Sequence, residues 1–176
     1  MSNIFIGALF VFLNFTININ GIKIGLIPDF IGYIIMVKGL AELENESPYF
    51  LKAKGFAKGM AVYTAILYAM DLFGLSYNFG IVAYLLGIAS IILTLYTSYM
   101  VVKGIEEMEA IRNTDLNAES LYSVWKVHAG FTLAACVLII IPFLSVICLL
   151  VSFVAAIVFL VALNKSKKLY YSPWNQ

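Results

Sequence analysis

The longest uncharged stretch of the chain contains an almost wholly apolar run, ACVLIIIPFLSVICLLVSFVAAIVFLVAL, from Ala135 to Leu163. A helix needs about 20 apolar residues to cross a membrane, so this stretch is too long for one crossing. A turn near Pro142 is therefore expected to divide it. Its residues do not alternate between apolar and polar side chains, which argues against the strands of a membrane β-barrel. The run predicts two membrane-spanning helices joined by a tight turn.

Composition extends this class to the whole chain. Of the 176 residues, 62% are hydrophobic and 12% are charged, and the mean hydropathy is +0.96. Soluble domains are about 45–50% apolar and about 25% charged, because a domain of this length needs a polar shell. The chain is therefore expected to be an integral membrane protein in contact with the lipid bilayer. Its net charge of +1 provides no basic field for binding nucleic acid.

Six hydrophobic segments follow one another along the chain. They cover about residues 3–19, 27–43, 56–75, 79–102, 122–141 and 143–163. Cytoplasmic loops carry an excess of Lys and Arg, and ten of the eleven basic residues fall on the side of both termini, leaving Lys23 alone on the other. The first segment lacks a positive leader and a cleavage site, so we expect a retained helix. The sequence predicts an all-α bundle of six transmembrane helices in the bacterial cytoplasmic membrane, as a single domain (1–176) with both termini cytoplasmic.

An internal repeat links two parts of the chain. VKGLAELE at residues 37–44 matches VKGIEEME at residues 102–109, with five identities in eight positions. A weaker match joins ESPYFLK, which begins at Glu46, to ESLYSVWK, which begins at Glu119. We expect a duplicated two-helix unit, over about residues 25–75 and 79–141. The alternative is that any helix leaving a membrane inward favours a Lys followed by a polar turn. Ser47 and Pro48 are typical of a helix N-cap and first helical residue.

Pro28 and Asp29 interrupt the second hydrophobic segment. Pro is tolerated in the first turn of a helix, so Pro28 predicts a helix start. Counting back from Lys38 at about 1.5 Å per residue would put Asp29 near the middle of the membrane, where an acid faces protein or water rather than lipid. Polar side chains at similar depth predict an outward-facing ligand-binding recess: Asn14, Asn18, Asp29, Tyr68 and Asp71, with Lys23 as counter-charge. The alternative is that both aspartates are structural and lie close to the membrane surface.

Other polar groups carry weaker signals. The acidic residues around the inner loops do not match the spacing of a calcium loop, and we expect ion pairs between them and Lys52, Lys54 and Lys126. His128 is the only histidine, and we expect it near the inner membrane interface, without the partners of a metal site. No catalytic motif or phosphate-binding loop is present in the sequence, so we expect neither enzyme activity nor a cofactor.

The first segment together with IPDFIGYI resembles small uncharacterised multi-pass membrane proteins of low-GC Gram-positive bacteria. The resemblance covers about residues 1–44 and implies a multi-pass fold, without an activity or a ligand. Two functions remain open. In the first, the recess binds or transports a small solute or ion: Asp29 and Asp71 bind a cation or proton, and Asn14 orients the ligand. In the second, the chain is a non-catalytic assembly subunit whose small residues, such as Gly32 and Gly87, hold a membrane protein partner or a second copy.

Overall fold

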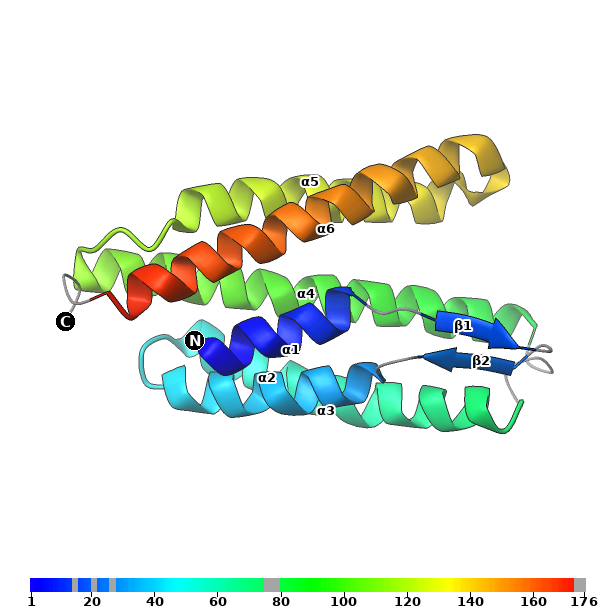
Figure 1. Cartoon of the computed structure of the whole chain (residues 1–176), viewed down its shortest axis with the longest axis horizontal. Coiled ribbons are helices and arrows are strands. Elements are labelled where there is room, and N and C mark those ends of the chain that lie inside the picture. Colours follow the sequence, from blue (N-terminus) through cyan, green and yellow to red (C-terminus); the bar gives the residue numbers. More distant parts are fainter. Residues whose placement is uncertain (14–15, 20–21, 26–27, 75–79, 173–176) are drawn as a thin grey trace. The chain divides into compact units, whose positions relative to one another are not determined.

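The computed structural model describes residues 1–13, 16–19, 22–25, 28–74 and 80–172, with side chains described outside residues 14–27. The helices are α1 (Ser2–Phe12), α2 (Asp29–Leu43), α3 (Pro48–Leu72), α4 (Ile81–Arg112), α5 (Ala118–Val137) and α6 (Pro142–Tyr170). Two strands, β1 (Thr16–Ile19) and β2 (Ile22–Gly25), separate α1 from α2, and a short 3₁₀ turn, η2 (Leu138–Ile140), follows α5. The chain divides into two compact units, Met1–Met100 and Val101–Gln176, and α4 runs from one into the other (Figure 1).

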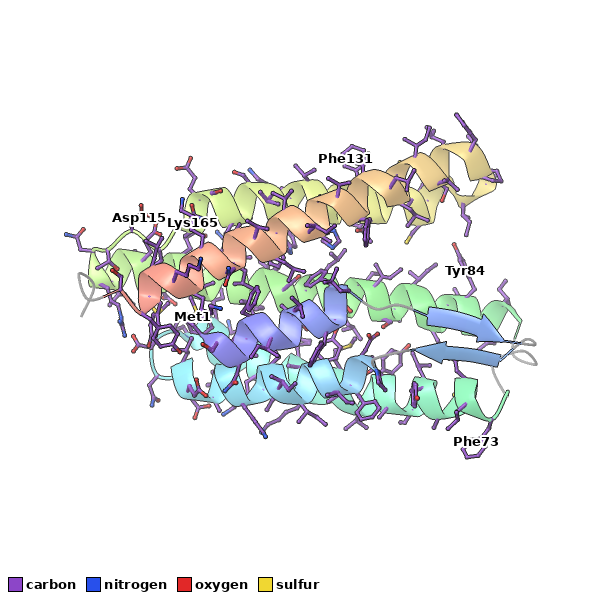
Figure 2. The ribbon with its side chains drawn as sticks, in the orientation of Figure 1. Met1, Phe73, Tyr84, Asp115, Phe131 and Lys165 are labelled. Atoms are coloured by element: carbon purple, nitrogen blue, oxygen red, sulfur yellow. The ribbon has the colours of Figure 1, made fainter. Side chains whose placement is uncertain are left out.

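A helix corresponds to each of the six predicted segments, so the helical class is confirmed. Three helical stretches of the described chain are long and apolar enough to cross a membrane: Ile81–Arg112, Ala118–Ile140 and Pro142–Tyr170. Ile140 and Phe143, at the turn between α5 and α6, are 87% and 79% exposed, as expected of side chains that face lipid. Figure 2 shows apolar side chains projecting outward, such as Phe73 directly after α3 and Phe131 on α5. These features indicate a membrane protein.

The helices α1 and α2 are shorter than the membrane-spanning segments predicted for that part of the chain. At about 1.5 Å per residue, α1 is about 16 Å long and α2 about 22 Å, against a hydrocarbon core of about 30 Å. The prediction of a first helix reaching residue 19 is wrong, because α1 ends at Phe12 and a strand begins at Thr16. The predicted number of six crossings therefore remains a prediction.

A β-hairpin precedes Pro28, where none was predicted from the sequence. β1 and β2 pair in antiparallel register, with Asn18 opposite Lys23 and Ile17 opposite Ile24. In sequence, both strands alternate apolar and polar residues on either side of Asn20 and Gly21, the pattern most typical of a two-residue hairpin. High hydropathy over the whole run masked this signal, because a short apolar run is compatible with helix or strand.

Glycines allow α1 and α2 to pack with their backbones in contact. A methyl group at Gly7 would lie 2.6 Å from the carbonyl oxygen of Gly32, and one at Gly39 would lie 2.6 Å from the backbone nitrogen of Ile4. The helices are antiparallel, since the Asn3 side chain at the start of α1 donates to Glu42 near the end of α2, at 2.7 Å. The glycines of α2 therefore form a close helix contact within the chain.

The turn between α2 and α3 is determined by local sequence. The Ser47 hydroxyl accepts a hydrogen bond from the backbone N–H of Tyr49 at 3.1 Å, and Pro48 is the first residue of α3. This confirms the predicted N-cap. Because the turn is short, α3 runs antiparallel to α2 and packs along it. The first half of α4 completes this unit: the hydroxyls of Tyr33 on α2 and Thr94 on α4 are hydrogen-bonded at 2.8 Å.

In the second unit, α5 and α6 form a long antiparallel hairpin, and Pro142 is the first residue of α6, which confirms the predicted turn. The buried face of α6 carries mainly small side chains at alternating spacings of three and four residues: Ser145, Cys148, Ser152, Ala155, Phe159, Ala162 and Ser166. This is the spacing of a left-handed coiled-coil seam. Small side chains in such a seam let two membrane helices approach closely.

Candidate functional site

The predicted recess residues that the structure describes lie on β1 and at the adjacent ends of α2 and α3. Asn14 lies outside the described residues, and of Asn18 only the backbone is described, in β1. Asp29 is the first residue of α2, after Pro28 as N-cap, so the predicted helix start is confirmed. Its side chain is half-buried and its Oδ1 atom is shielded from solvent. The carboxylate thus lies at the positive end of the helix dipole, which favours a negative charge.

Tyr68 and Asp71 lie in the last turns of α3, beside the start of α2. The rings of Tyr68 and Phe30 meet edge to face, with centroids 5.9 Å apart and planes at 60°. Asp71 is three residues beyond Tyr68 and half-buried, and its backbone carbonyl accepts from the N–H of Gly74 at the helix end. Because Phe30 directly follows Asp29, this ring contact brings the region of Asp29 next to the helix end that carries Tyr68 and Asp71.

The hairpin adjoins the same end of the first unit. β2 packs against α3, and Figure 1 shows the two strands continuing from the ends of α1 and α2 alongside the last turns of α3. The register also brings Lys23, the proposed counter-charge, opposite Asn18. The elements that carry Asn18, Asp29, Tyr68 and Asp71 are therefore neighbours, although their sequence positions span more than fifty residues.

The acidic residues of the inner loops hold helix ends together. Glu44 forms an ion pair with Lys54, joining the end of α2 to α3. Glu109 accepts hydrogen bonds from the backbone N–H groups of Leu116 and Ala118, at 2.7 and 3.0 Å, joining α4 to the start of α5. These two glutamates occupy the same position of the sequence repeat. Each repeat thus ends in a carboxylate that bridges to the following helix.

Two of the three lysines expected in ion pairs have aromatic contacts instead. The ammonium of Lys52 lies 5.6 Å from the ring centroid of Tyr49, and that of Lys126 lies 4.8 Å from the ring centroid of Tyr122. Such cation–π contacts contribute about 0.5–1 kcal/mol at exposed sites. Within the part of the chain that the structure describes, no three His, Cys, Asp or Glu side chains gather into a possible metal site.

His128 is buried between α5 and α6, only 7% exposed, so the expectation of a simple interfacial histidine missed its environment. Its Nδ1 lies 3.1 Å from both the carbonyl oxygen and the hydroxyl of Ser152. The Thr132 hydroxyl lies 2.6 Å from that of Ser152 and donates to the His128 carbonyl at 2.8 Å. The three side chains form one polar cluster in the α5–α6 seam. The seam spacing of small residues on α6, which pairs with the helix that carries His128, is the sequence signal that could have predicted this buried cluster.

An open apolar groove lies along α3 in the first unit. It has a volume of about 500 Å³ and is lined by Leu51, Lys52, Gly55, Phe56, Gly59, Met60, Tyr63 and Leu93. A methyl group on Gly55 or Gly59 would meet nothing within 4 Å. The Gly-x-x-x-Gly spacing of these residues, typical of close contacts between membrane helices, is present in the sequence but was not predicted to mark a site.

The glycines proposed to hold a partner differ in their surroundings. A methyl group on Gly32 would lie 2.9 Å from the carbonyl oxygen of Gly7 and from a side-chain carbon of Val11. The expectation that Gly32 contacts a partner is therefore corrected, since α1 already covers it. A methyl group on Gly87 of α4 would meet nothing within 4 Å, so this face of the helix is open.

Comparison with protein-family models, curated proteins and solved structures finds no match to this chain.

Proposed function

We propose that this chain is a multi-pass protein of the bacterial cytoplasmic membrane that binds, and transports, a small cationic solute or ion in a recess open to the outside. Three helical stretches of suitable length and hydropathy support the membrane location. The distribution of basic residues supports six crossings with both termini in the cytoplasm. In this topology α3 makes the third crossing, and the hairpin continues the short helices α1 and α2 toward the outside.

The Phe30–Tyr68 ring contact, at 5.9 Å, carries the proposal. It joins the start of α2 to the last turns of α3, so the two aspartates, the tyrosine and the hairpin are grouped at one end of the first unit. Under the proposed topology this end is the outer one, opposite the lysines of the inner loops. The carboxylates of Asp29 and Asp71 would then be within reach of water from the outside.

The chemistry of these groups favours a cation. Carboxylates and hydroxyl oxygens are hard ligands suited to small cations, and a carboxylate at depth also exchanges a proton. In this role Asp29 and Asp71 bind the cation or proton, Tyr68 and Asn18 supply neutral oxygens, and Asn14 orients the ligand. The proposed role is therefore binding and transport rather than catalysis.

A thermal-shift titration tests binding directly. Purified protein in detergent would be titrated separately with Na⁺, K⁺, Mg²⁺ and Ca²⁺, because a ligand that binds only the folded state raises its stability. We expect one of these cations to raise Tm, and Asp29→Asn and Asp71→Asn to abolish the shift. Glu119→Gln, which removes an exposed carboxylate from the second unit, is the control that should keep it. Equal shifts in wild type and both aspartate variants would contradict the proposal.

Thiol chemistry tests the geometry. In a Cys136→Ser, Cys148→Ser background, Asp29→Cys and Asp71→Cys would be labelled in intact cells with a membrane-impermeant reagent. Labelling at both positions from outside, together with an oxidant-induced disulfide in the double variant, is the expected result. A disulfide needs Cα atoms within about 7 Å, so cross-linking would indicate that both positions lie in one recess. Absence of labelling at both positions would make the aspartates separate structural features.

One observation favours the assembly subunit as a second candidate. The open face of α4 at Gly87 offers close approach to another membrane helix. Under this alternative, purification in mild detergent recovers a stoichiometric membrane partner or a homo-oligomer, and Gly87→Leu releases it. Gly130→Leu is a control for the added side chain, because Gly130 is equally open and lies on another helix, α5. A partnerless monomer would count against this function.

A further inference from the structure

The groove along α3 has the dimensions of a site for an extended chain. Its floor is formed by Gly55 and Gly59, which lack side chains, while Phe56 and Met60 flank them and Leu93 of α4 contributes from the neighbouring helix. From Leu51 to Tyr63 the groove runs for about 18 Å at the helical rise of about 1.5 Å per residue. Apart from one lysine and one tyrosine, its lining residues are apolar or glycine.

The two polar side chains mark the ends of the groove. Lys52 lies in the second turn of α3, is exposed, and places its ammonium over Tyr49, toward the start of the helix. Tyr63, at the far end, donates its hydroxyl hydrogen to the carbonyl oxygen of Leu86 at 2.7 Å, which removes that polar group from the groove. A ligand in the groove therefore meets a positive charge at one end and an apolar surface along the rest.

We infer that the groove binds one acyl chain of an anionic phospholipid, with the phosphate of its headgroup at Lys52. This inference rests on the membrane location proposed above, but not on the recess at Asp29. In a bilayer, an open apolar groove fills with hydrocarbon rather than water. Lys52 belongs to the start of α3, where the inner-loop lysines mark the membrane surface, so its charge lies at headgroup level when the chain lies in the groove. Basic side chains in such positions attract anionic headgroups.

A helix from another protein fits the groove less well. A helical segment of about 10 Å diameter and about 18 Å length occupies about 1,400 Å³, nearly three times the groove volume of about 500 Å³. A second copy of this chain is disfavoured by charge. In a two-fold parallel contact the same patch of both copies meets, so the two Lys52 ammonium groups would lie at the same depth in the membrane and repel each other.

Native mass spectrometry with defined lipids tests the inference. Purified protein in detergent would be titrated with phosphatidylglycerol or phosphatidylcholine, and bound lipid counted for each variant. Wild type should prefer phosphatidylglycerol. Lys52→Gln should lower phosphatidylglycerol affinity about five-fold, as expected for one lysine near a headgroup, and leave phosphatidylcholine binding unchanged. Gly59→Leu should reduce binding of both lipids by filling the groove, whereas Gly130→Leu, which adds the same side chain at an open position on α5, should not.

The outcomes separate lipid from other occupants. Unchanged lipid binding in both Lys52→Gln and Gly59→Leu, with circular dichroism showing normal helix content, would overturn the inference. A change from dimer to monomer in Gly59→Leu, without loss of bound lipid, would instead assign the groove to a second copy and also overturn it. The cation-induced Tm shift that tests Asp29 should be unaffected by Gly59→Leu, so failure of either proposal can be recognised without the other.

Discussion

Replacement of Gly7 by Ala is the most direct test of the α1–α2 contact. The new methyl group would lie 2.6 Å from the Gly32 carbonyl oxygen, 2.7 Å from the Met36 backbone nitrogen and 2.8 Å from the Met36 Cβ. None of these atoms is the far end of a flexible side chain, so α1 must move away from α2. That movement would also disturb the contact of Ile4 with Gly39, one turn along the pair.

The expected magnitude follows from two opposing effects. Overpacking a close helix contact costs about 1–3 kcal/mol, and three stiff contacts at once place Gly7→Ala in the upper part of that range. Ala favours the helix over Gly by about 1 kcal/mol. The net expected loss in the free energy of unfolding is about 1–2 kcal/mol. At Gly87, where the methyl group meets nothing within 4 Å, only the second effect acts, and Gly87→Ala should stabilise the protein by up to about 1 kcal/mol.

Both variants would be measured by reversible unfolding in mixed micelles, as the sodium dodecyl sulfate fraction is raised and helix content is followed by circular dichroism. The opposite signs are the decisive result. If Gly7→Ala were as stable as Gly87→Ala, α1 would not be packed on α2 through its glycines, and the structural basis for the first unit would be refuted.

Three further changes probe single contacts by the same unfolding assay. Ser47→Ala removes the N-cap of α3 and should cost about 1 kcal/mol, whereas Ser47→Asp, which can also cap, should cost less. Ser152→Ala removes the hydroxyl that joins Thr132 and His128 and should lower the free energy of unfolding by about 0.6–1.7 kcal/mol. Ser166→Ala, whose hydroxyl donates to the Ala162 carbonyl within α6, should lower it less. Equal losses would show that the polar cluster does not stabilise the protein. Glu109→Gln weakens two hydrogen bonds to backbone N–H groups and should cost about 1 kcal/mol, more than Glu44→Gln at its ion pair with Lys54.

Helix starts marked by proline or a capping serine were the part of this fold most accessible from sequence. Ser47 and Pro48 specify a cap through local hydrogen bonding, and Pro28 and Pro142 specify helix starts because proline lacks a backbone N–H. These effects depend on a few adjacent residues, so the structure agrees with them. The hairpin depends on a competition between hydropathy and alternation in one short run, and in the structure the alternation prevails.

The candidate site was less accessible because it depends on distant residues. The approach of Tyr68 to Phe30 follows from the close packing of α2 on α3, and the burial of His128 follows from its pairing with Ser152, 24 residues later. Gly32 and Gly87 look equivalent in sequence, yet one is covered by α1 and the other is open. Small residues predict close contact without indicating whether the contact lies within the chain.

The hairpin links the short helices to the proposed recess. α1 and β1 together extend about 30 Å, at about 1.5 Å per helical and about 3.4 Å per strand residue, which equals the thickness of the hydrocarbon core. A two-stranded hairpin pairs only part of its backbone polar groups with its own partner strand, and each group left in lipid without a hydrogen bond costs several kcal/mol. β2 packs on α3, and water that reaches the hairpin would satisfy the backbone groups that its strands leave unpaired. If α1 starts and α2 ends at the inner surface, water that enters from the outside to the level of Asp29 satisfies the strands, and it also opens the recess to a cation.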